Sequence, residues 1–143
     1  MKLISKTALL ILLIAILYLF VTGNLLSTNP FVIAGQLFAI ALSIWARRSF
    51  MAGHFSIHAQ PVERTLLSTG PYKFIRHPMY TAALLLIWSG ILGHLSIITV
   101  SIGLLAVSII FVRIADEEQL LLECYPGYSD YSATTKRIIP FVM

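Results

Sequence analysis

Four long apolar stretches, none of which contains Lys, Arg, Asp or Glu, constrain this chain more than any other feature. They occupy residues 7–26, 30–46, 78–95 and 96–112. Each is close to the roughly 17–25 residues that a helix needs to cross a hydrocarbon core of about 30 Å. A helix also pairs its backbone polar groups internally, as a lipid environment requires. The sequence therefore predicts an all-α integral membrane protein with four transmembrane helices.

The composition supports a membrane setting for a single domain spanning residues 1–143. Hydrophobic residues make up 58% of the chain and charged residues only 11%, whereas about a quarter of a typical soluble domain is charged. The basic residues flank the apolar stretches instead of forming a patch, which argues against nucleic-acid binding. The single cysteine, Cys124, excludes an internal disulfide and a multi-cysteine metal cluster.

The linkers and charges predict the topology. The linkers at 23–29 and 93–94 are short, so we expect two antiparallel hairpins, residues 1–46 and 78–112. All ten Lys and Arg residues lie in the N-terminus, the middle loop (47–77) or the tail (113–143). The positive-inside rule places these parts on the cytoplasmic side of the membrane, N-in and C-in, and we expect a short helix in the C-terminal tail. Cleavage of the first helix as a signal peptide is disfavoured, because its apolar run exceeds about 7–15 residues.

The middle loop ends in a dense polar segment, residues 68–80, at the start of the third predicted helix. Pro78 suits the first position of a helix, which places His77 at the helix mouth. Unpaired N–H groups and the positive end of the helix dipole favour a carboxylate there. The alternative is purely structural: Arg76 and His77 are positive-inside flanks, and Tyr72 and Tyr80 are interfacial aromatics.

A second polar segment, residues 113–118, directly follows the fourth apolar stretch. If the helix continues, Arg113 and Glu117 lie four residues apart on one face. The alternative is a solvated helix extension carrying one weak surface ion pair. The tail then contains a tyrosine-rich turn at 125–131 and ends in an Arg-Ile-Ile-Pro run at 137–140.

Together these segments contain G-P-Y-x-x-x-R-H-P-x-Y, then R-x-x-x-E-E, then Y-x-x-Y and R-x-I-P, spread over residues 64–141. This pattern resembles the isoprenylcysteine carboxyl methyltransferase and phospholipid methyltransferase superfamily of membrane enzymes. The chain is shorter than eukaryotic members, so the resemblance implies a minimal prokaryotic version in the inner membrane. It implies S-adenosylmethionine as cofactor, bound on the cytosolic side, and a lipid-like or prenylated acceptor that enters from the bilayer. It implies Arg113 as the catalytic residue that contacts and orients the substrate. It also implies cofactor contacts by Arg64, Thr65, Leu66, Leu67, Tyr72, His77, Pro78, Met79, Tyr80 and Glu117.

The resemblance implies isoprenylcysteine carboxyl O-methylation in the first place, with N-methylation of a phospholipid amine as the alternative. A carboxylate acceptor needs a cation to orient it, and the Arg113 guanidinium can hold it through two parallel hydrogen bonds. An amine or thiol acceptor must lose a proton, and the sequence identifies no base for that step. An NADPH-dependent membrane reductase, which shares R-H-P-x-Y, and a non-catalytic membrane scaffold are further alternatives.

Some positions depart from the family pattern or stay unassigned. Ala82 stands where the family often has Gly, and an upstream polar cofactor contact falls near Ile57 or His58. His54 and His58, with His77, imitate a metal site, but no cysteine or well-placed carboxylate completes the three or four ligands that zinc needs. We therefore predict no metal, and we interpret residues 49–60 as an amphipathic interfacial segment.

Overall fold

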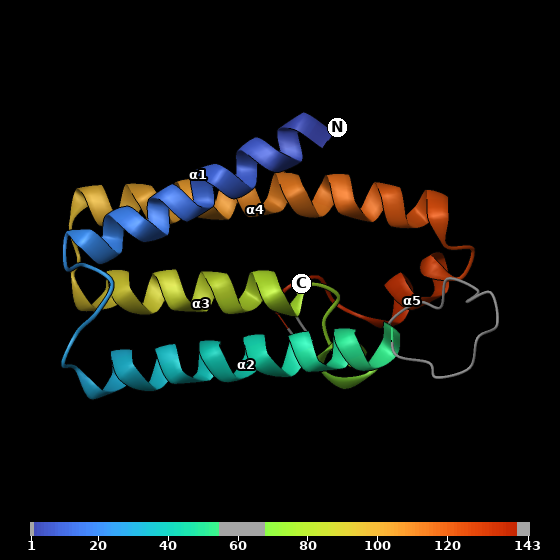
Figure 1. The fold of residues 1–143 in the computed structure, drawn as a ribbon, viewed down its shortest axis with the longest axis horizontal. Coiled ribbons are helices and arrows are strands. Elements are labelled where there is room, and N and C mark those ends of the chain that lie inside the picture. The colour runs from blue at the N-terminus through green and yellow to red at the C-terminus, as the bar shows by residue number, and fades with distance from the viewer. Residues whose placement is uncertain (1, 55–67, 140–143) are drawn as a thin grey trace.

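The computed structural model describes residues 2–54 and 68–139, and within them the side chains of 10–50 and 68–139. Four long helices lie side by side, and two short helices gather at one end of them (Figure 1). The elements are α1 (Lys2–Val21), α2 (Pro30–His54), η1 (Gly70–Lys73), α3 (Pro78–Gly93), α4 (Ile97–Cys124) and α5 (Tyr128–Thr134). The all-helical fold and the short helix near the C-terminus agree with the sequence-based expectation.

Only the second of the two predicted hairpins packs as a pair of neighbouring helices. Helix α3 packs against both α2 and α4, but α1 packs against α4 instead of its sequence neighbour α2 (Figure 1). Small residues allow α2 to pack closely against α3, because a Cβ added to Gly35 of α2 would lie only 2.5 Å from the Ser89 Oγ of α3. Residues 1–46 are therefore connected as a hairpin, yet its two helices bury their faces on different partners.

Two helices extend well beyond the apolar stretches that predict them. The uncharged stretches end at residues 46 and 112, but α2 continues to His54 and α4 to Cys124, so the helix continuation that the sequence left open after residue 112 is present. A charged residue ends a membrane crossing without ending a helix, because the backbone hydrogen bonds continue into water. Glycine and proline are absent between 47 and 52 and between 113 and 124, so nothing breaks either helix there. Arg113, Glu117 and Glu118 consequently lie on α4.

The described helices are suited to a membrane. Pro30–Phe50 and Ile97–Cys124 are long and apolar enough to cross one, and Leu10–Val21 and Pro78–Gly93 are shorter apolar helices. Large apolar side chains are exposed along α1, α2 and α4, Leu10, Leu37 and Leu104 among them. So much exposed apolar surface indicates a lipid-facing exterior. The chain is a membrane protein, and crossing by all four helices stays a prediction.

The C-terminal segment returns to the start of α3 and fixes its position. Ile75 and Lys136 form a short parallel bridge, in which the Arg76 N–H donates to the Lys136 carbonyl at 2.7 Å. The His77 N–H donates to the Arg137 carbonyl at 3.0 Å. Ile138 joins the buried cluster that α1, α3 and α4 share. Residues far apart in sequence are thus held together at this end of the bundle.

Gly90, near the C-terminal end of α3, packs against the loop before α2, and a Cβ added there would meet backbone atoms. It would lie 2.7 Å from the Leu25 carbonyl oxygen and 3.0 Å from the Leu25 Cα. Gly90→Ala should destabilise the protein by about 1–3 kcal/mol, because a packed backbone has to move. The measurement is the thermal unfolding midpoint in detergent.

Gly127→Ala is the matched control. An added Cβ there meets nothing within 4 Å, and the φ of −87° suits alanine. Its cost should stay under about 1 kcal/mol, the value of a helix N-cap. Equal midpoints for the two variants would contradict the close approach of α3 to the loop before α2.

Candidate active site

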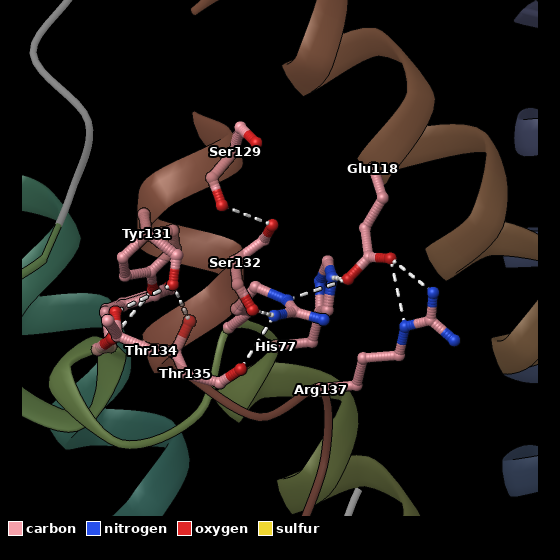
Figure 2. Close-up of polar contacts among 10 residues, drawn as sticks. His77, Glu118, Ser129, Tyr131, Ser132, Thr134, Thr135 and Arg137 are labelled. Carbon is pink, nitrogen blue, oxygen red and sulfur yellow. Dashed lines mark hydrogen bonds and ion pairs between the residues drawn. The ribbon is translucent and has the colours of Figure 1, made fainter. Parts of the chain in front are cut away.

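The Glu118 carboxylate is the centre of the polar cluster where α3, α4 and the C-terminal segment meet (Figure 2). Its side chain is only 10% exposed. Arg76 Nε donates to Oε1 at 2.8 Å, and Arg137 donates to Oε2 from Nε at 3.0 Å and from a terminal nitrogen at 2.9 Å. A buried carboxylate needs such partners, because desolvation without them is costly.

Arg76 also ties the short helix α5 to this cluster. Its side chain is 9% exposed. One terminal nitrogen donates to the carbonyl oxygens of Ser132 and Thr135, the latter at 2.7 Å. These carbonyls belong to the last turn of α5 and its C-cap, where a cation is favourable. Arg76 thereby connects the start of α3, helix α4 and helix α5 through one guanidinium.

His77 occupies the N-cap position of α3, directly before Pro78, and is almost fully buried. Its ring stacks on that of Tyr80, with 5.7 Å between centroids. Its Nε2 lies 3.5 Å from Glu118 Oε1, and this buried nitrogen makes no hydrogen bond within the described part of the chain. Burial lowers the pKa of His77 below its ordinary 6.5, partly offset by Glu117 and Glu118, which favours the neutral ring.

Tyr80 brings Arg113 and Glu117 together. Its hydroxyl donates to Glu117 Oε2 at 2.9 Å and accepts from Arg113 Nε at 3.0 Å. The Arg113 guanidinium carbon also lies 5.7 Å from the centre of the Tyr80 ring, within cation–π range. Because α4 continues past residue 112, Arg113 and Glu117 do share a helix face, as expected. That face turns towards α3.

The other predicted site residues do not lie together. Tyr72 lies in η1, and its carbonyl accepts a hydrogen bond from the Tyr131 hydroxyl at 2.7 Å. Met79 is half-exposed and lines an apolar cavity of about 360 Å³ between α1, α2 and α3, together with Ala82. The part of the prediction that lies outside the described residues comprises Ile57, His58, Arg64, Thr65, Leu66 and Leu67.

Within residues 2–54 and 68–139, no group of three or more His, Cys, Asp or Glu side chains is arranged to hold a metal ion. His54 ends α2, and its side chain is not among those described.

Sequence reasoning missed the residues that organise the site. It assigned a role to Glu117 but none to the neighbouring Glu118, and it treated Arg76 only as a topology determinant. The signal was present: Glu118 is the second acid of the E-E pair, and Arg76 and Arg137 are the arginines of R-H-P and R-x-I-P. Pairing across 42 residues depends on the tertiary fold, so spacing alone could not have shown it.

The site residues fit the polar end of an S-adenosylmethionine molecule. That end carries an ammonium group, which needs hydrogen-bond acceptors. Glu117 supplies a carboxylate as acceptor on an exposed part of α4. Aromatic rings such as that of Tyr80 also attract cations at their faces.

Comparison with known proteins matches residues 30–127 to a phospholipid methyltransferase family. The match includes His77, Tyr80, Arg113 and both glutamates, and it covers well over half of the chain. It confirms the resemblance drawn from the motifs. No curated protein and no solved structure matches the chain.

The two adjacent glutamates provide the test of this geometry. Glu118→Gln leaves Arg76 buried without its anion, so it should destabilise the protein by about 3 kcal/mol. Glu117→Gln keeps an acceptor for Tyr80 at an exposed position and should cost less than about 1 kcal/mol. Thermal unfolding midpoints in one detergent give the comparison. Similar midpoints for the two variants would show that Glu118 does not hold the cluster together.

Proposed function

The chain belongs to the phospholipid methyltransferase family, and we propose that it uses S-adenosylmethionine to methylate a lipid-like acceptor at the cytoplasmic end of a four-span bundle. The family is one of methyltransferases that act on lipid-like substrates. The observation that carries the proposal is the contact of Tyr80 with both Glu117 and Arg113, beside the buried His77. A carboxylate, a guanidinium and an aromatic ring converge there, inside the region that the family match covers.

When bound, S-adenosylmethionine supplies a methyl group that its sulfonium already activates for transfer. The chain's own task is to bind, to orient and to exclude water. Glu117 would hold the ammonium end of the cofactor, and the Tyr80 ring beside it would favour the cofactor's cationic part. Glu118 stays out of contact with ligand, because both of its oxygens already accept from arginines.

Arg113 is the residue that orients the acceptor. It lies one helical turn before Glu117, so the two can act on different ligands side by side. A guanidinium holds a carboxylate through two parallel hydrogen bonds, which favours a prenylcysteine-type carboxylate. A phospholipid amine is the second acceptor class, and the name of the matched family favours it. The apolar cavity lined by Met79 and Ala82 suits the hydrocarbon part of either acceptor.

Two rival functions predict different ligands. A membrane reductase would bind NADPH, and the family match to methyltransferases argues against it. A non-catalytic scaffold would bind neither cofactor, and it would have no use for the contact that joins Arg113, Tyr80 and Glu117. Binding of S-adenosylmethionine by the detergent-purified protein, together with methyl transfer from labelled cofactor to a lipid extract, would decide between them.

The different roles proposed for Glu117 and Arg113 can be tested by substituting each residue. Glu117→Ala should weaken cofactor binding by about 1–3 kcal/mol, because a charged partner is lost. Arg113→Ala should leave cofactor affinity nearly intact and slow methyl transfer strongly, and Arg113→Lys should restore little activity with a carboxylate acceptor. Calorimetry and single-turnover rates measure the two effects.

Two results would contradict this division. Loss of cofactor binding in Arg113→Ala would mean that Arg113 contacts the cofactor. Full activity in Arg113→Ala or Glu117→Ala would mean that the substituted residue is not part of the site. Efficient rescue by Arg113→Lys would favour a phosphate-bearing acceptor, where a point charge suffices.

The proposed orientation in the membrane can be tested by cysteine labelling. In a Cys124→Ala background, a cysteine at Thr28 should react only with impermeant thiol reagents outside the cell, and one at Ser68 only after the membrane is opened. Both positions are exposed in the structure, so burial does not limit labelling. Detergent-solubilised protein should label at both positions, as the control. Labelling of the two from the same side of intact cells would overturn the four-span arrangement.

A further inference from the structure

The apolar cavity between α1, α2 and α3 has one polar side chain in its wall, that of Ser43. Apart from Ser43, the described residues that line the cavity are apolar, among them Ile16 of α1 and Ala83 of α3. Two further lining residues, Ile40 and Ile44, are about half-exposed, so the cavity opens on the apolar outer surface of the bundle. A hydrocarbon chain can therefore enter it from the bilayer.

The hydroxyl of Ser43 is unlike those of three other serines in apolar parts of the long helices. Ser89, Ser101 and Ser108 each donate to the carbonyl four residues earlier, at 2.6, 2.7 and 3.0 Å respectively. Within the residues that the structure describes, the half-buried Ser43 hydroxyl makes no hydrogen bond. A hydroxyl in an apolar setting is costly without a partner, so that of Ser43 is available to a ligand in the cavity.

Ser43 lies near the end of the apolar part of α2. It comes four residues before Arg47, which places it about 6 Å inside the first charged side chain of this helix. Gly35 of α2 approaches Ser89 of the antiparallel α3 (Figure 1). Counting eight residues from each of these two places Ser43 at the level of about residue 81 of α3, one turn beyond the start of that helix.

The cavity and the proposed site share a wall. Tyr80 packs against the same buried cluster as Ile16 and Ala83, which line the cavity. Met79, which precedes Tyr80 on α3, lines it as well. A chain in the cavity therefore ends beside Tyr80, whose hydroxyl contacts the charged side chains of α4.

The size of the cavity limits what can occupy it. A dry cavity of about 150 Å³ holds a benzene molecule, so a volume of about 360 Å³ has room for about fourteen carbon atoms. That volume suits one hydrocarbon chain of a membrane lipid. A second chain of the same lipid would stay in the bilayer.

We propose that Ser43 is a specificity-determining residue: its hydroxyl donates to the ester carbonyl at the head of an acyl chain, and that chain occupies the cavity. The inference rests on the proposed function and narrows its acceptor to an acyl phospholipid. Ester carbonyls lie at the boundary between the headgroups and the hydrocarbon core, which is the depth of Ser43. A prenyl chain begins instead at a thioether sulfur, which is only a weak hydrogen-bond acceptor. Arg113 can hold the phosphate of such a lipid through two parallel hydrogen bonds, as it would a carboxylate.

The test uses two acceptors that differ only in the carbonyl: dioleoyl phosphatidylethanolamine and its dialkyl ether analogue of the same chain length. Methyl transfer from labelled S-adenosylmethionine is measured in detergent micelles for wild type and Ser43→Ala. We expect the wild type to have a KM about fivefold lower for the ester lipid, in line with one neutral hydrogen bond. Ser43→Ala should raise the KM for the ester lipid to that for the ether lipid and leave kcat unchanged.

Ser108→Ala is the matched control, because it makes the same chemical change at an exposed position of α4 whose hydroxyl bonds its own helix. It should keep the preference for the ester lipid. Equal KM values of the wild type for the two lipids would overturn the proposal. A rise of both KM values in Ser43→Ala would also overturn it, because a lost carbonyl contact affects only the ester lipid.

Lipid binding without turnover separates this proposal from the proposed function. A phosphatidylethanolamine with a photoreactive diazirine in one acyl chain should label the parts of α2 and α3 that line the cavity, and label them several-fold less in Ser43→Ala. Equal labelling of the two variants would indicate a bilayer lipid only, and methylation of a prenylcysteine but not of the phospholipid would refute the role of Ser43 alone. Labelling that depends on Ser43, in a protein that methylates none of these lipids, would refute the proposed function but not the carbonyl contact.

Discussion

A single buried carboxylate, that of Glu118, is the interaction on which this end of the structure depends. It binds Arg76 from the start of α3 and Arg137 from the C-terminal segment. Neither the buried Glu118 carboxylate nor the buried Arg76 guanidinium is tolerable alone, so these two charges require each other, and the half-exposed Arg137 adds a second partner for Glu118. The arrangement joins chain segments that are far apart in sequence, and it places His77 and α5 relative to α4.

The neighbouring glutamates divide the work because successive residues of a helix point in different directions. Glu118 turns inward and is saturated by arginines, while Glu117 is exposed and contacts Tyr80. One acid thus holds the architecture and the other stays available for a ligand. The resemblance to known motifs drew attention to the pair, but only the contacts show how differently its members are used.

The position of the site suits a reaction between a polar cofactor and an apolar acceptor. Charged side chains gather where α3 begins and α4 continues beyond its apolar part, and apolar side chains cover the outer faces of the long helices. The apolar cavity beside Met79 begins two residues from His77 in sequence. A methyltransferase for lipid-like substrates needs both environments within a short distance, because donor and acceptor have to be aligned.

The sequence by itself determined the helical class, the membrane setting and the family, because uncharged stretches of about 20 residues and ordered motifs are local features. It also placed Arg113 and Glu117 on one face, since that follows from helical spacing alone. It did not settle where α2 and α4 end, because the limit of a membrane crossing is not the limit of a helix. The tertiary structure alone decided that α1 packs on α4 and that Glu118 binds Arg76 and Arg137. These features depend on which residues meet across long stretches of chain, where burial and charge pairing select the partners.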